Sequence, residues 1–358
     1  MANYPMLDPQ AKALLLKGMA IPAHPLALTA ERKLDERHQR ALTRYYCAAG
    51  AGGVAIGVHT TQFAIRDPQH ALYEPVLQLA RETADACAAS AGRRILKVAG
   101  ICGKTEQAVR EAQFAAVEGY DLGLLSLGAL KDATDADLLK HCRQIALVIP
   151  LFGFYLQPAA GGRVLSYDFW RQFVEIPNVC AIKIAPFNRY QTFDVIRAVV
   201  QAGRMDDVAL YTGNDDNILV DLLTTYPLRI GPRGQFARIV GGLLGQWAVW
   251  TKRAVDYVER ARTTWEGGQD INFSWLQLGA MLTEANGAIF DAAHGYAGCI
   301  PGIHEVLRRQ GLMEGIWCLD PAETLSPGQS AEIDRVCKAY RWLNDDEFVA
   351  EHLDDWLR

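Results

Sequence analysis

The amino-acid sequence predicts an eight-stranded (β/α)8 barrel, an α/β TIM barrel, followed by a C-terminal helical domain. Short apolar runs rich in Val, Ile and Leu recur along the first two thirds of the chain, and longer segments with helical spacing separate them. Such alternation is typical of a parallel sheet that is buried on both faces. Eight units within about 220 residues fit a closed barrel, because open doubly wound sheets usually have fewer strands.

The order of the predicted elements follows from these runs. We expect strands at residues 17–23, 53–58, 94–99, 121–127, 146–155, 179–185, 208–213 and, more weakly, 228–231. We expect helices at residues 35–49, 68–90, 105–118, 133–144, 166–175, 189–202 and 215–226. Residues 235–262 and the chain beyond 270 have helical spacing without a further strand-like run. The sequence therefore predicts a barrel with the active site over residues 12–234 and a helical domain over 235–358.

Composition excludes several classes of protein. Half of the 358 residues are hydrophobic, 22% are charged and the net charge is −5, as in ordinary globular proteins. The basic residues are scattered, so nucleic acid is not an expected partner. No run reaches the roughly 20 apolar residues of a membrane span, and the N-terminus lacks the features of a signal peptide. We therefore expect a cytoplasmic protein without membrane contact, whose eight cysteines are reduced.

Lys183 is the first candidate catalytic residue. It stands within the apolar run VCAIKIAPF, and its neighbours on the same strand face, Ala181 and Ala185, are both small. Burial disfavours a charged ammonium, so the amine becomes a neutral nucleophile that can form an imine with a ketone. The alternative is a strand-end lysine that reaches solvent.

Two further features lie at predicted strand ends, where the active sites of such barrels are found. Tyr155 ends an apolar strand on the same face as Gly153, and its phenol would transfer protons to and from a neighbouring imine. Thr60 and Thr61 follow the second strand and offer hydroxyls for a substrate carboxylate. A packed aromatic and ordinary turn residues are the respective alternatives. His59 stands beside the threonines, but no second ligand at metal spacing accompanies it, so we expect no metal.

Taken together, these motifs resemble the dihydrodipicolinate synthase and N-acetylneuraminate lyase family, whose members are imine-forming barrels. The likeness spans about residues 12–300 and rests on Thr60 and Thr61, on Tyr155, on Lys183 28 residues later, and on the stretch YTGNDD at 211–216. The resemblance implies that Lys183 and Tyr155 are catalytic and that Thr60, Thr61 and Gly213 contact the substrate. It also implies a homo-oligomer, dimer or tetramer, and a reaction that needs no cofactor beyond the covalent imine.

The sequence also departs from the family pattern. The usual GTTGE stretch reads HTTQF here, and Ala129 stands where the synthase has a proton-relaying tyrosine. Ala160 replaces an arginine five residues after the tyrosine, although Arg163 in the longer turn is placed to reach a second carboxylate of the substrate. These departures argue against an assignment to lysine biosynthesis.

The sequence thus predicts a lyase of the class I aldolase type. It would form a Schiff base between Lys183 and pyruvate or another 2-oxo acid, and then make or break a carbon–carbon bond. Dehydration or decarboxylation of a sugar-derived oxo acid by the same lysine is one alternative, and a non-catalytic barrel that binds a small acid is another. A metal-dependent aldolase is a further alternative, but it would need several metal ligands at strand ends, and His59 is the one candidate that we find.

Overall fold

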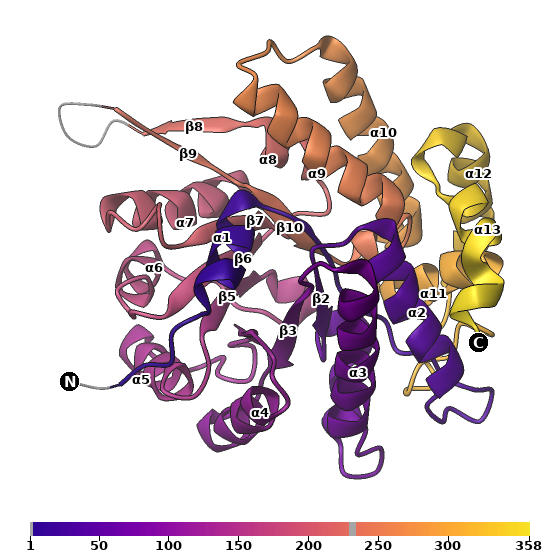
Figure 1. The fold of residues 1–358 in the computed structure, drawn as a ribbon, viewed down its shortest axis with the longest axis horizontal. Coiled ribbons are helices and arrows are strands. Elements are labelled where there is room, and N and C mark those ends of the chain that lie inside the picture. The colour runs from indigo at the N-terminus through magenta and orange to yellow at the C-terminus, as the bar shows by residue number, and fades with distance from the viewer. Residues whose placement is uncertain (1–2, 229–233) are drawn as a thin grey trace.

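The computed structural model describes residues 3–228 and 234–358. Within these ranges, eight parallel strands form one sheet that closes into a barrel, and helices surround it (Figure 1). The barrel strands are β1 (Ala20–Pro22), β2 (Gly53–Ile56), β3 (Leu96–Ile101), β4 (Leu122–Leu125), β5 (Leu151–Leu156), β6 (Val179–Ala185), β7 (Ala209–Thr212) and β10 (Gly241–Leu244). A parallel bridge between Ala23 and Ala55 joins the first strand to the second and completes the ring. The predicted fold class is confirmed.

The helices follow the strands as expected for a (β/α)8 barrel. Around the barrel lie α1 (Pro9–Lys17), α2 (Glu36–Ala49), α3 (Tyr73–Ala91), α4 (Thr105–Val117), α5 (Asp135–Ala146), α6 (Tyr167–Phe173), α7 (Arg189–Gln201) and α8 (Ile218–Leu223). The C-terminal helices are α9 (Thr251–Glu266), α10 (Phe273–Ile289), α11 (Cys299–Arg309), α12 (Gln329–Ala339) and α13 (Asp346–Trp356).

The eighth barrel strand lies later in the chain than we predicted. Of the expected strand at 228–231, residues 229–231 lie outside the described ranges, and Leu228 ends β8 (Thr225–Leu228). That strand pairs antiparallel with β9 (Gln235–Arg238) in a separate two-stranded sheet. The barrel is closed instead by β10, which pairs with β1 and β7, so the barrel continues past residue 234 and the expected helix over 235–262 is wrong in its first part.

Two glycines explain why this strand was missed. A Cβ at Gly241 would lie 2.4 Å from the backbone oxygen of Met19, and one at Gly242 would lie 2.6 Å from the ring of Trp247. The closing strand therefore requires close backbone approach, which only glycine allows, although glycine weakens the strand signal in a sequence.

The barrel separates two apolar cores. The inner core fills the barrel and includes Phe152, Phe154, Ala181 and Ala185, while α1 closes its N-terminal end through Leu15. The outer core lies between the strands and the surrounding helices. Because successive side chains of a strand point to opposite faces, membership in one core or the other shows which way each residue points.

The C-terminal helices pack beside α2 and α8 and are anchored by a buried polar group. The Tyr45 hydroxyl of α2 donates to the carboxylate of Asp345 at 2.7 Å and accepts from the Thr251 N–H at 2.7 Å. Asp345 also accepts the Lys252 N–H at 3.0 Å, so one carboxylate joins α2, α9 and α13. This anchor holds the C-terminal helices against the barrel, where they contribute to the site described below.

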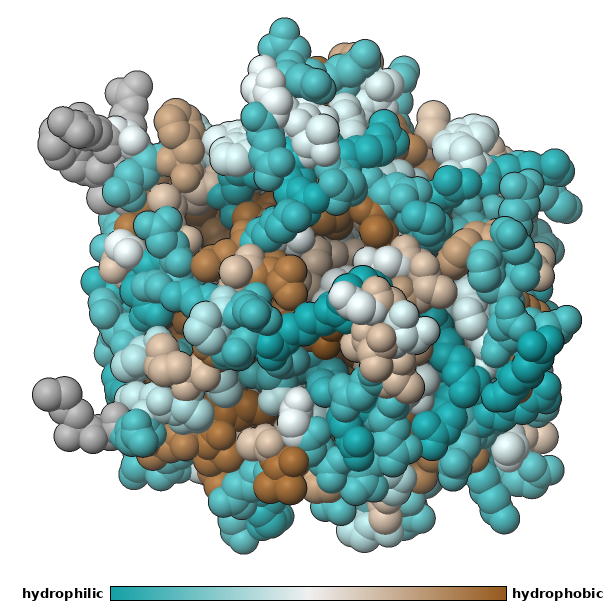
Figure 2. Space-filling model, viewed as in Figure 1, coloured by the Kyte–Doolittle hydropathy of each residue, from teal (hydrophilic) through white to brown (hydrophobic). Residues whose placement is uncertain are grey.

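The surface carries no continuous apolar covering on the face drawn in Figure 2, where hydrophilic residues predominate and apolar residues form separate patches. Among the residues that the structure describes, no helix combines the length and the apolar character needed to cross a membrane.

Candidate active site

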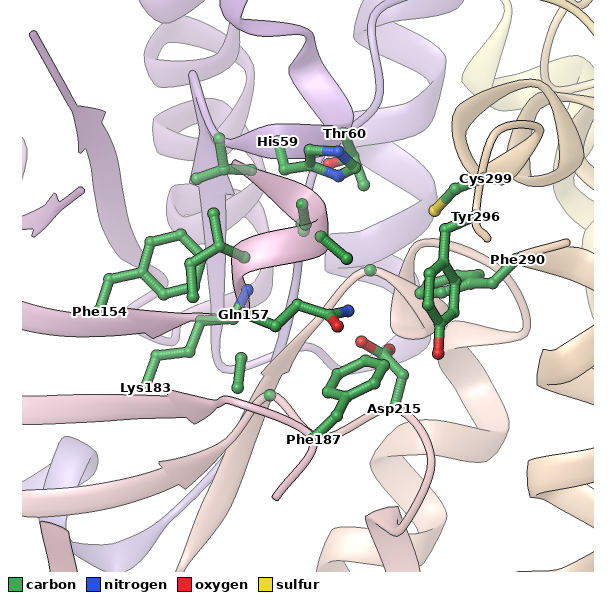
Figure 3. Close-up of a pocket in the computed structure, with 18 residues that line it drawn as sticks. His59, Thr60, Phe154, Gln157, Lys183, Phe187, Asp215, Phe290, Tyr296 and Cys299 are labelled. Carbon is green, nitrogen blue, oxygen red and sulfur yellow. The ribbon is translucent and has the colours of Figure 1, made fainter. Parts of the chain in front are cut away.

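Lys183 lies on the inner face of β6, at a cavity of about 90 Å3 at the C-terminal end of the barrel. Its side chain is 7% exposed, and Ala181 and Ala185 share its face, as predicted. Burial lowers the pKa of the amine to about 8, and the negative charge of Asp215 opposes this effect. The Nζ atom makes no hydrogen bond or salt bridge to any described residue, so the amine is available to a ligand in the cavity (Figure 3).

Gly213 is required by the path of the lysine side chain. A Cβ at this position would lie 2.7 Å from the Cε of Lys183 and 2.7 Å from the Cβ of Ala185. The glycine lines the cavity, and its N–H donates to the Ile184 carbonyl at 2.7 Å. Gly213 therefore lies at the cavity, where the Lys183 side chain leaves no room for a Cβ.

Tyr155 does not lie at the amine, which corrects our expectation. Phe154 is the residue of β5 directly opposite Lys183, and Tyr155 pairs with Ile184 on the outer face. The phenol packs against Trp170 of α6, with ring centroids 5.3 Å apart, and its hydroxyl bonds both the N–H and the carbonyl of Leu165 at 3.2 Å. The alternation of side chains along the strand thus places Phe154 in the cavity and Tyr155 among the helices.

The two threonines have different surroundings. Both belong to a short 3-10 helix, His59–Thr61, that follows β2. Thr60 lines the cavity, and its hydroxyl donates weakly to the His24 carbonyl at 3.3 Å. The Thr61 hydroxyl donates to the same carbonyl at 2.7 Å and accepts the Gly57 and Val58 N–H groups at 3.0 and 3.2 Å. Thr60 is therefore the one that faces a ligand, whereas Thr61 holds the loop in shape.

Arg163 lies away from the cavity, which corrects a second expectation. Its guanidinium donates to the Leu130 carbonyl and, at 3.1 Å, to the Ala133 carbonyl. These bonds tie the turn after β5 to the segment that precedes α5, and they engage the positive charge with main-chain oxygens. The arginine is not among the residues that line the cavity.

Asp215 is a residue of the site that sequence reasoning missed. It follows β7 within the YTGNDD stretch that supported the resemblance, but Gly213 was the one residue of that stretch predicted to lie at the site. Its side chain lines the cavity, and burial raises its pKa to about 7, an effect that the charge of Lys183 opposes. Its Oδ1 atom accepts the Gln246 N–H at 3.0 Å, so the 3-10 helix Gln246–Ala248, which follows the closing strand, positions this carboxyl group.

His59, which the sequence placed beside the threonines without a metal partner, also lines the cavity. Burial, together with the charge of Lys183, lowers the pKa of its imidazole to about 4, so the ring is neutral near pH 7. Gln157, which follows β5, adds an amide to the same wall.

The C-terminal part of the chain supplies the remaining wall. Phe290, Tyr296 and Cys299 lie between and within α10 and α11, yet they line the cavity together with Phe187 of the barrel (Figure 3). The rings of Phe187 and Tyr296 meet edge to face at 6.0 Å. No local signal in the sequence pointed to these residues, because they reach the site only through the packing of the C-terminal helices.

A possible metal-ligand group lies elsewhere. In the described ranges, Asp35, His38 and Glu314 bring potential ligand atoms close together. The Asp35 carboxylate already caps α2 and bonds the His38 ring at 2.7 Å. None of the three residues lines the cavity.

The fold is shared with solved enzyme structures. No protein-family model and no curated protein sequence matches the chain. YagE, an E. coli K12 prophage protein of the dihydrodipicolinic acid synthase family solved with pyruvate, is 17% identical, with a TM-score of 0.71 over 90% of this chain and 98% of that one. Dihydrodipicolinate synthase from Oceanobacillus iheyensis is 18% identical, with a TM-score of 0.70 over 92% and 99%.

N-acetylneuraminate lyase from Fusobacterium nucleatum is a third structural neighbour, at 14% identity and a TM-score of 0.68 over 91% of this chain and 99% of that one. At these identities the similarity establishes the fold alone. The resemblance inferred from the motifs is confirmed at that level, because each similarity covers 90% or more of this chain.

Proposed function

We propose that the protein is a lyase of the dihydrodipicolinate synthase and N-acetylneuraminate lyase family, which forms an imine between Lys183 and a 2-oxo acid. The observation that carries the proposal is the buried, unpaired amine at the mouth of the barrel, with a pKa of about 8. A neutral amine attacks the keto carbon to give a carbinolamine, and loss of water then gives a protonated imine. That imine accepts electrons from the neighbouring bond, so a carbon–carbon or carbon–oxygen bond can be broken or formed.

The structural neighbours support the type of substrate. YagE was solved in complex with pyruvate, and its fold is similar to that of this chain. In this chain the Thr60 hydroxyl is the nearest equivalent of the predicted carboxylate site, since Thr61 bonds backbone groups instead. No cofactor enters the proposed reaction, because the lysine itself supplies the covalent group.

The charges around the cavity favour an acid with a single carboxylate. Lys183 is the one cationic side chain among its described lining residues, since His59 is neutral and Arg163 lies elsewhere. The rings of Phe154, Phe187 and Phe290 also line the cavity. A second carboxylate at the far end of the substrate would have no cationic side chain of the described cavity lining to pair with. We therefore propose a monocarboxylic 2-oxo acid, with an uncharged second part or second substrate.

Lys183 would serve aldol cleavage and dehydration alike, so the second part of the substrate decides between them. We place carbon–carbon bond chemistry first because the structural neighbours include a dihydrodipicolinate synthase and an N-acetylneuraminate lyase. A cytoplasmic location and a homo-oligomeric state stay predictions. Sedimentation that shows a clean monomer would contradict the second.

The test is reductive trapping. The protein is incubated with pyruvate, with longer monocarboxylic 2-oxo acids or with 2-oxoglutarate, then treated with borohydride and weighed by intact-protein mass spectrometry. We expect an adduct with the monocarboxylic acids, little with 2-oxoglutarate, and none in Lys183→Ala, whose circular dichroism should match the wild type. A folded wild-type protein that forms no adduct with any acid would refute the imine and favour the non-catalytic, ligand-binding alternative.

A further inference from the structure

The proposed imine chemistry needs a proton donor inside the cavity. The hydroxyl of a carbinolamine is a poor leaving group and departs as water only when an acid protonates it. Tyr155, the residue that the motif pattern suggested for this step, has its hydroxyl bonded to Leu165 on the outer side of the barrel. Another group of the cavity must therefore carry the proton.

Four titratable side chains besides Lys183 line the cavity, namely His59 after β2, Asp215 after β7, and Tyr296 and Cys299 from the C-terminal part. Burial raises the pKa of Tyr296 above 10 and that of Cys299 well above 9, so both are protonated near neutral pH and neither is available there as a base. The imidazole of His59, with a pKa of about 4, is rarely protonated there. A general acid works best when its pKa is close to the working pH, and Asp215, at about 7, meets this condition.

The position of Asp215 is fixed from three sides. Its Oδ1 atom accepts the Gln246 N–H at 3.0 Å, and its carbonyl accepts from the Asn286 side chain of α10 at 3.3 Å. The preceding residue, Asn214, accepts the Phe187 N–H at 3.0 Å and donates to buried Asp221 of α8 at 3.0 Å. The carboxyl group is therefore held in one place, as a group that must meet a reacting atom should be.

The second oxygen of the carboxyl group is free for a ligand. Within residues 3–228 and 234–358, no hydrogen bond engages Oδ2 of Asp215, and no salt bridge joins Asp215 to Lys183. The two groups nevertheless influence each other's titration, so they share the cavity without direct contact. Figure 3 shows the carboxyl group directed into the set of cavity-lining side chains. Both groups line the same cavity, so a substrate bound there can meet the amine and the acid together.

We propose that Asp215 is the catalytic acid and base of this site, in the role that the motif pattern assigned to Tyr155. The inference rests on the proposed function. The carboxylic acid gives its proton to the carbinolamine hydroxyl, water leaves, and the nitrogen lone pair completes the C=N bond of a protonated imine beside the new carboxylate. The carboxylate then takes a proton from the carbon next to the imine carbon, which gives a neutral enamine and restores the acid.

The experiment follows exchange of the methyl protons of pyruvate in D2O by proton NMR, together with borohydride trapping. Exchange reports enamine formation and needs no second substrate. Asp215→Asn keeps the size of the side chain and its acceptor for Gln246 but cannot transfer the proton. We expect it to lower the exchange rate by ~10²–10⁴-fold, the usual effect of removing one general acid or base, while slow trapping on Lys183 persists. Asp216→Asn, which alters the exposed neighbouring carboxylate, is the matched control and should keep the wild-type rate.

The pH profile separates a catalytic role from a structural one. The wild-type exchange rate should change with pH around a pKa near 7, and this pH dependence should be absent in Asp215→Asn. Asp215→Glu should recover part of the rate and part of the pH dependence. The titratable groups around Asp215 are its neighbour Asp216 and the cavity-lining Lys183, His59, Tyr296 and Cys299. The same pH dependence in Asp216→Asn would assign it to Asp215. If Asp215→Asn traps pyruvate and exchanges protons at the wild-type rate, the role of Asp215 is refuted while the proposed imine function stands. If the wild type forms no adduct, the proposed function fails and this inference fails with it.

Discussion

The ring of Phe154 lies against the amine of Lys183, with the Nζ atom 4.5 Å from the ring centroid. The two residues are direct partners in the pairing of β5 with β6, so both point into the barrel. The adjacent Tyr155 must therefore point outward, and its phenol belongs to the packing between β5 and α6.

This geometry predicts that Tyr155→Phe keeps the chemistry of the site. The substitution removes the hydroxyl that bonds the Leu165 backbone, so we expect the free energy of unfolding to fall by about 1 kcal/mol. Pyruvate trapping and methyl-proton exchange should stay within twofold of the wild type. If the rate of methyl-proton exchange fell 100-fold or more while the fold stayed intact, the Tyr155 hydroxyl would take part in catalysis. That result would contradict its outward orientation.

The lowered pKa of Lys183 predicts its reactivity toward acylating reagents. With a pKa of about 8 in place of 10.5, roughly one amine in ten is neutral at pH 7, instead of about one in three thousand. The rate of labelling by acetic anhydride at Lys183, followed by peptide mass spectrometry, should therefore rise with pH and level off above about pH 8. Prior reduction of the pyruvate adduct should protect the residue. A rate that keeps climbing to pH 10.5 would show an unshifted, solvated amine.

Gly213→Ala should disturb the lysine without unfolding the barrel. The added methyl group would lie 2.7 Å from the Cε of Lys183, so the amine has to move from its present position. We expect the trapping rate with pyruvate to fall at least tenfold. Gly287→Ala is the matched control, because a Cβ at that position of α10 would meet no atom within 4 Å. Equal trapping rates in the two variants would mean that the lysine position is adjustable.

A buried ion pair beneath the Thr60 loop should contribute strongly to stability. Arg66 Nε lies 2.9 Å from the Glu111 carboxylate, both side chains are 8% exposed, and the guanidinium also donates to the carbonyls of Gly57 and Gly100. Glu111→Gln leaves the cation buried without its counter-charge, so we expect the free energy of unfolding in urea to fall by about 3–5 kcal/mol.

Glu106→Gln is the control for that variant. It removes an exposed carboxylate of the same helix that pairs with exposed Arg110, and such pairs contribute at most about 1 kcal/mol. If the two variants were equally stable, the Arg66 site would be hydrated and the pair would not support the loop.

Local sequence patterns were sufficient for the barrel and for Lys183. Strand and helix periodicity depends on neighbouring residues only, so the alternating runs predicted seven barrel strands at their observed places. The same alternation along β6 put Lys183 on one face with Ala181 and Ala185, which the structure confirms. Thr60 was found from its place at a strand end, because the ends of parallel barrel strands meet at one mouth, whereas Gly213 came from the family resemblance.

The tertiary structure alone decided the rest of the site. The direction of Tyr155 depends on its register against β6, and a count of 28 residues between tyrosine and lysine does not determine that register. Arg163 reaches main-chain carbonyls instead of the cavity, and Tyr296 and Cys299 arrive from helices more than a hundred residues after the lysine. Asp215 became visible as a candidate acid only when burial and the nearby amine were known, because a carboxyl group acquires a pKa near 7 from its surroundings and not from its neighbours in sequence.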